Sequence, residues 1–143
     1  MRDFEQPPFS MHLDRTPGAI GDWHLTHDPA GGFAGMAWRS AAATIDQFRA
    51  KHAWLSTAPE SGFVRVLTVQ RRDSTGVDIL RGCVLSRVGA GASASDLTSR
   101  AELEDVLTDL FGLDLADIDP ATLTAMWDRM EREHERWVTA GRP

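Results

Sequence analysis

A strand–turn–strand pattern in the middle of the chain most constrains its fold. Residues 63–71 form a run rich in β-branched side chains, residues 73–76 supply turn chemistry, and residues 77–88 form a second apolar run. Such a pair predicts an antiparallel hairpin, with a bend at Gly82 in its second strand. Helical patterns flank this hairpin on both sides. The order of strands and helices therefore predicts an α+β fold.

The segments around the central hairpin extend this prediction. Residues 1–22 contain three prolines and two glycines, which predicts an irregular N-terminal segment or an edge segment. Residues 23–27 and 33–38 read as a second hairpin, followed by a helix whose apolar face runs from Ile45 to Leu55. Beyond residue 96 the pattern is helical, with two helices expected. We therefore expect antiparallel hairpins with one helix between them and two C-terminal helices.

Composition excludes several classes of protein. The 143 residues include 15 basic and 21 acidic side chains, for a net charge of −6, which disfavours an electrostatic nucleic-acid binder. No apolar run reaches the roughly 18 residues that a membrane span needs. The single cysteine, Cys83, has no partner for an internal disulfide and fits a reducing, cytoplasmic compartment. It also rules out a cysteine-based metal cluster within one chain.

The residues that could carry chemistry are isolated along the sequence. Cys83 falls within an expected strand, where a buried thiol behaves as an inert apolar group. His24 and His27 would point to opposite faces of their strand, which disfavours a shared metal ion. Glu131 and His134 have the spacing of half a di-iron helix motif, but the expected helices are too few for that bundle. From these residues alone, no self-contained active site is expected.

One stretch is more informative than any single residue. It begins with the tripeptide 46–48 and continues with Ala53-Trp54-Leu55-Ser56-Thr57-Ala58-Pro59-Glu60-Ser61-Gly62-Phe63-Val64-Arg65. This stretch resembles the arylamine N-acetyltransferase family, in which a helix ends in a Ser-Thr-x-Pro-x-Ser-x-Phe segment that leads into a long hairpin. The central hairpin, the helix that ends in Phe111-Gly112-Leu113 and the final helix are similar to the family's in order and spacing. The resemblance covers about residues 20–139.

The resemblance implies an activity and also a missing part. The family transfers an acetyl group from acetyl-CoA to an arylamine or hydrazine through a cysteine, a histidine and an aspartate, by covalent catalysis. Its Arg-Gly-Gly-x-Cys and Asp-x-Gly-Phe-Gly motifs do not occur here, and Cys83 does not match the catalytic position. The resemblance therefore implies no catalytic residue in this chain. It implies a partial β-barrel domain with one helix over residues 23–95, and the helical part of a lid domain over residues 96–143.

What the resemblance carries over is contact with the coenzyme. The segment 59–63 would line the CoA cleft: Ser61 would hydrogen-bond CoA and Phe63 would form an apolar wall, with Thr57 as a further candidate. Alternatively, these residues only end a helix and Phe63 belongs to the core. No metal is implied.

The resemblance leaves the role of the chain open. It predicts a truncated or half-enzyme, inactive alone, whose partner is a separate N-terminal catalytic half or a second copy of the chain. The alternatives are a non-catalytic module that binds CoA or a partner, a relative of the amide synthases in the family, and a gene remnant.

Overall fold

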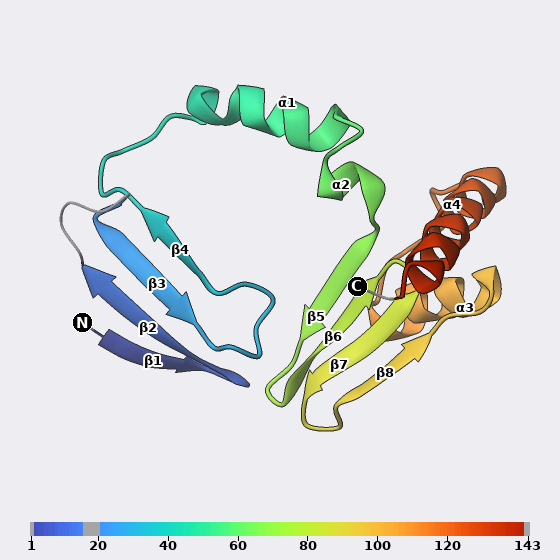
Figure 1. Ribbon diagram of the computed structural model, residues 1–143, viewed down its shortest axis with the longest axis horizontal. Coiled ribbons are helices and arrows are strands. Elements are labelled where there is room, and N and C mark those ends of the chain that lie inside the picture. Colours follow the sequence, from blue (N-terminus) through green and yellow to red (C-terminus); the bar gives the residue numbers. More distant parts are fainter. Residues whose placement is uncertain (1, 16–20, 142–143) are drawn as a thin grey trace.

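The structure is a computed structural model that describes residues 2–15 and 21–141. It consists of two four-stranded antiparallel sheets, in the strand orders β1-β2-β3-β4 and β5-β6-β7-β8. A helical segment connects the two sheets, and the C-terminal helices lie beside the second sheet (Figure 1). The predicted α+β class, with antiparallel hairpins and a helix between them, is confirmed. The strands of the described part form two open sheets and do not close into a barrel.

The first sheet begins earlier in the chain than the sequence predicted. It contains β1 (Arg2–Gln6), β2 (Phe9–Arg15), β3 (Trp23–His27) and β4 (Gly35–Trp38). The irregular alternative for residues 1–22 is therefore wrong for residues 2–6 and 9–15, whereas the edge alternative agrees with β1, which lies at the edge of its sheet. Residues 16–20 lie outside the described part. The physical reason is local. The two adjacent prolines, 7 and 8, are confined to the turn between β1 and β2, where they cost no hydrogen bonds of the sheet.

None of the three helices between the sheets carries a buried side chain. It comprises a short 3₁₀ turn, η1 (Ile45–Phe48), followed by α1 (Arg49–Thr57) and α2 (Gly62–Arg65). Sequence reasoning expected the second strand run to start at Phe63, but that residue lies in α2. Ser61 caps α2, and this local hydrogen bonding outweighs the β propensity of Phe63 and Val64.

The second sheet contains the hairpin that the sequence predicted. Strand β5 (Thr68–Arg72) pairs with β6 (Gly76–Arg81), so that Thr68 opposes Arg81. The run 77–88 is not one bent strand, however. It divides into β6 and β7 (Val84–Gly89) around a turn at Gly82, whose φ of +55° suits glycine. Strand β8 (Ser93–Asp96) completes the sheet.

The core lies between the second sheet and the C-terminal helices. These are α3 (Arg100–Asp105), the π turn η2 (Val106–Leu110) and α4 (Pro120–Thr139). Helices α3 and α4 both start at an N-cap: the side chain of Ser99 accepts from Glu102 N–H, and that of Asp119 accepts from Thr122 N–H. One buried cluster joins the sheet to the helices: Leu80, Cys83, Leu97, Leu103, Leu107, Phe111, Trp127 and Met130.

Candidate functional site

The predicted coenzyme segment begins with Ser61, which the structure places fully inside the chain at 0% exposure. Its Oγ donates a hydrogen bond to the Leu55 carbonyl oxygen at 2.7 Å and accepts one from the Phe63 N–H at 3.3 Å. These two bonds join the end of α1 to the start of α2. The hydroxyl of Ser61 is thereby committed to holding the two helices together.

The other two predicted contact residues differ from Ser61 in exposure. Thr57 is exposed, and its Oγ1 donates to the Ala53 carbonyl oxygen at 2.7 Å, one turn back in α1. Phe63 is 82% exposed, so its ring is open to contact and is not part of the core. The structure brings Ser61 and Phe63 together through the cap, while the Thr57 hydroxyl points back along its own helix. CoA contact by any of the three stays a prediction.

Phe63 is one of four large apolar side chains that are exposed on the segment between the sheets. Ile45, Phe48 and Trp54 also lie on the segment between the sheets and are exposed by 76%, 56% and 44%. We call these four residues the bridging face. Four large apolar side chains exposed on 19 residues are an unusual concentration, and exposed apolar patches mark interaction or binding sites. Only Trp54 has a described side-chain partner, the Lys51 Nζ at 4.0 Å from its ring centroid.

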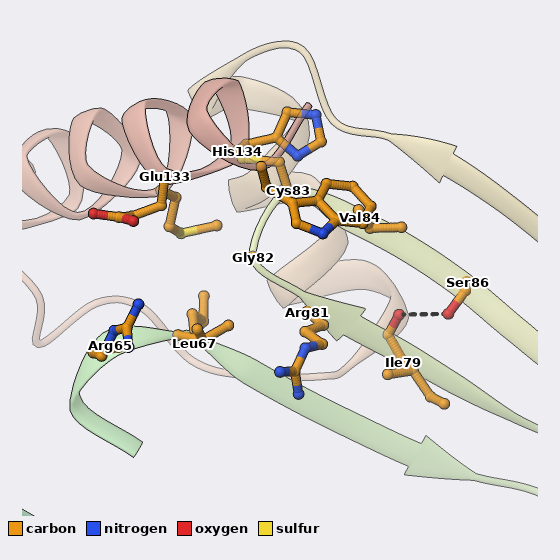
Figure 2. Close-up of a pocket in the computed structure, with 13 residues that line it drawn as sticks. Arg65, Leu67, Ile79, Arg81, Gly82, Cys83, Val84, Ser86, Glu133 and His134 are labelled. Atoms are coloured by element: carbon orange, nitrogen blue, oxygen red, sulfur yellow. Dashed lines mark hydrogen bonds between the residues drawn. The ribbon is translucent and has the colours of Figure 1, made fainter. Parts of the chain in front are cut away.

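A pocket of about 500 Å³ opens next to this segment, between the second sheet and α4. Figure 2 shows Arg65, Leu67 and Arg81 along one wall and Glu133 and His134 on α4 opposite. Sequence reasoning missed this pocket. The signal that could have found its helical wall is the spacing of Met130, His134 and Trp137 at i, i+4 and i+7 of one helix face.

Cys83 lies in the wall of this pocket, in the turn between β6 and β7 and not within a strand as predicted. Its exposure is only 2%. Burial, followed by the negative charges of Glu131 and Asp96, raises the pKa of the Cys83 thiol to about 11. The nucleophilic form is the thiolate, which is scarce at neutral pH when the pKa is so high. The environment is that of a structural cysteine.

The histidines that suggested metal binding do not form a site. His27 is buried between the rings of Phe9 and Phe33, at centroid distances of 5.0 and 4.6 Å, whereas His24 is exposed. His134 Nε2 lies 3.5 Å from Asp96 Oδ2. Among residues 2–15 and 21–141, no three histidine, cysteine or acidic side chains gather as a metal centre would require.

The comparison with protein families decides the classification. A sequence model described as N-acetyltransferase matches residues 36–119, which includes α1, the Ser61 cap and the whole second sheet. The chain belongs to the arylamine N-acetyltransferase family. A search of curated proteins finds no significant match.

Solved structures of arylamine N-acetyltransferases share the fold. The chain aligns with the Mycobacterium marinum protein in complex with CoA at a TM-score of 0.75 and 19% identity, covering 92% of this chain and 48% of the other. The Mycobacterium tuberculosis protein aligns at a TM-score of 0.71 and 22% identity, covering 85% of this chain and 45% of that protein. The Salmonella typhimurium protein aligns at a TM-score of 0.71 and 19% identity, covering 88% of this chain and 48% of that protein. The chain thus spans about half the length of these arylamine N-acetyltransferases.

No helix of the described residues combines the length and the apolar character that crossing a membrane requires.

Proposed function

We propose that this chain serves acyl transfer of the arylamine N-acetyltransferase type, with acetyl-CoA as the donor and an arylamine or hydrazine as the acceptor. The observation that carries the proposal is the family match over residues 36–119. The chain contributes the part of the fold that receives the coenzyme. The catalytic cysteine, histidine and aspartate come from another stretch of polypeptide, so the chain is inactive alone.

The chemistry of Cys83 supports the inactivity of the isolated chain. Covalent acyl transfer needs an activated thiolate, usually with a base in hydrogen-bond reach. Cys83 is buried, its pKa is raised to about 11, and the nearest charges that affect it are acidic. Such a thiol would not attack a thioester at neutral pH. Its free, reduced state also fits the reducing cytoplasm that we propose as the compartment.

Coenzyme contact would use the open ring of Phe63, held in place by the Ser61 cap. Because the Ser61 hydroxyl is committed to Leu55 and Phe63, its role is to position the segment. The exposed ring then offers an apolar wall to the pantetheine chain. That the Mycobacterium marinum structure contains CoA supports this donor class.

Calorimetric titration of the chain with CoA tests the coenzyme proposal. We expect saturable binding that Phe63→Ala weakens by about tenfold or more, since a wall lost from a binding cleft removes on the order of 1.4 kcal/mol. Phe4→Ala is the matched control, because Phe4 is an exposed phenylalanine on the first sheet. Equal affinities for the wild-type chain and Phe63→Ala, or no binding at all, would refute coenzyme contact at this segment.

The partner that we propose for the bridging face is the catalytic half of the fold. Related structures continue for about as many residues again as this chain aligns with, and Ile45, Phe48, Trp54 and Phe63 lie exposed on the segment between the sheets. Sedimentation velocity with a separately produced N-terminal half of a related enzyme tests this. We expect a one-to-one complex that Phe48→Asp abolishes. Self-association of the chain in place of that complex would contradict the proposal and favour a second copy.

A further inference from the structure

The pocket beside α4 has the shape of a small-molecule site. Its apolar floor comes from two directions: Ile79 and Val84 on the second sheet with Leu67 just before β5, and Met130 and Trp137 on α4. The volume of about 500 Å³ falls within the range of about 300–1,000 Å³ that is typical of ligand pockets. An aromatic side chain and a polarizable sulfur atom facing β-sheet aliphatics favour a flat apolar group as the occupant.

The charged residues of the wall favour an anion. Arg65 and Arg81 both line the pocket, and within the described part of the chain no hydrogen bond or ion pair engages either guanidinium. The one acidic residue of the wall, Glu133, is neutralised by Arg136, whose Nη1 lies 2.6 Å from the Glu133 carboxylate. Two arginines without a described partner therefore line the pocket, in a chain whose net charge is −6. Figure 2 shows Arg65 beside Leu67 and Arg81 below the β6–β7 turn, both on the sheet side of the pocket.

The remaining polar groups of the wall do not point to catalysis or metal binding. His134 lies against Asp96 and next to Trp137, with ring centroids 5.7 Å apart. Cys83 is nearly inaccessible. With its histidine paired and its thiol buried, the pocket can hold a ligand but has no group placed to react with it.

We propose that this pocket binds an amphipathic anion, an aromatic carboxylate of one or two rings. Arg65 and Arg81 bind the carboxylate, since guanidinium groups match its planar geometry. The aromatic part lies against Trp137, Met130 and Ile79. The inference goes beyond the acyl-transfer proposal, because it involves neither Phe63 nor a thioester, and it can hold whether or not CoA binds.

The direct test is a titration of the chain with 2-naphthoate, monitored by ¹⁵N-resolved NMR. We expect saturable shifts of the Trp137 indole N–H and of the Gly82 and Val84 amides. Arg65→Gln and Arg81→Gln should each weaken binding by about tenfold, the loss expected for one charge-assisted contact. The matched control is Arg39→Gln, since Arg39 is an exposed arginine just after β4, on the first sheet. 2-Naphthamide, which keeps the rings without the charge, should bind at least tenfold more weakly than 2-naphthoate.

Several results would overturn the proposal. They are the absence of saturable shifts at Trp137 and Gly82, equal affinity for 2-naphthamide, and unchanged affinity in the Arg65→Gln, Arg81→Gln double variant. Shifts confined to Trp54 would also overturn it, because they would place the probe on the bridging face. Both arginines are exposed, so these variants should fold, and circular dichroism verifies it.

Discussion

Arg71 on strand β5 donates a hydrogen bond from Nη1 to the main-chain carbonyl oxygen of Leu110, over 2.6 Å. Leu110 is the last residue of the π turn η2, where main-chain carbonyls have no helical partner. One side chain thus links the second sheet to the end of the helical layer. This contact gives Arg71 a structural role.

We expect Arg71→Met to reduce the free energy of unfolding by about 1 kcal/mol, because the Leu110 carbonyl oxygen loses its donor in a partly exposed position. Urea denaturation followed by circular dichroism measures this. Arg72→Met is the matched control, since the structure gives the neighbouring Arg72 side chain no hydrogen bond or ion pair among described residues. Equal midpoints for the two variants would show that the contact is energetically neutral.

Ser61→Ala should destabilise the chain by about 1–2 kcal/mol, in the absence of any coenzyme, because it removes an N-cap and leaves the Leu55 carbonyl oxygen without its donor. Thermal unfolding measures the effect. Thr57→Ala serves as the comparison, because Thr57 is exposed and its bond to Ala53 lies within one helix. If the two substitutions cost the same, Ser61 does not hold α1 and α2 together as the structure indicates.

Asp73 should make the second sheet sensitive to acid. The Arg87 side chain, and then the Thr75 N–H and hydroxyl, hold the pKa of Asp73 far below its ordinary value of 3.8. A carboxylate with a lowered folded-state pKa contributes stability above its unfolded pKa, and the contribution falls away as the pH drops through the folded-state value. The stability difference between wild type and Asp73→Asn should therefore be constant above about pH 5 and shrink below pH 3.8. If the stability difference between wild type and Asp73→Asn instead grew as the pH fell, this would contradict the hydrogen bonding of Asp73 to Arg87 and Thr75.

His12 has the opposite pH dependence. Hydrogen bonding to Asp3, with a smaller effect from Asp14, raises the pKa of His12 above 6.5. A raised folded-state pKa stabilises the fold fully below the unfolded value of 6.5, and the effect is lost as the pH rises through the folded value. NMR titration of the imidazole should give a value above 6.5 that falls in Asp3→Asn, and falls less in Asp14→Asn. An unchanged pKa of His12 in Asp3→Asn would show that Asp3 on strand β1 does not hydrogen-bond His12.

Cys83 should resist alkylation. With a pKa near 11, on the order of one thiol in a thousand is ionised at pH 8, and the sulfur is nearly inaccessible. We expect iodoacetamide to modify the native chain at least a hundredfold more slowly than the chain in urea, as followed by mass spectrometry. Rapid modification of the native chain would show that the β6–β7 turn opens, and would revive Cys83 as a candidate nucleophile.

Local chemistry explains which parts of the fold the sequence revealed. The β5–β6 hairpin was predictable because its turn residues and its β-branched strands both favour a hairpin. The starts of α3 and α4 were predictable because Ser99 and Asp119 are residue types that commonly cap helix N-termini. Strands β1 and β2 were missed because a proline pair was read as irregular structure, when it occupies only their turn. The helix Gly62–Arg65 was missed because one buried cap outweighs the propensity of Phe63 and Val64.

The candidate sites were harder to predict, because they depend on residues far apart in the chain. Resemblance to the family pointed to Phe63, but whether its ring is core or surface depends on the tertiary structure. The pocket joins Arg65, Arg81 and Trp137, which come from three elements. No spacing rule links them, so only the packing of α4 against the second sheet reveals the pocket.

The most direct test of the central claim is an acetyl-transfer assay with acetyl-CoA and an arylamine, in which release of free CoA is measured. The purified chain alone should give no turnover above that of its Cys83→Ala variant, whereas a mixture with the N-terminal half of a related enzyme should release CoA. Turnover by the chain alone would contradict the account, and its loss in Cys83→Ala would show that this buried cysteine is the nucleophile after all.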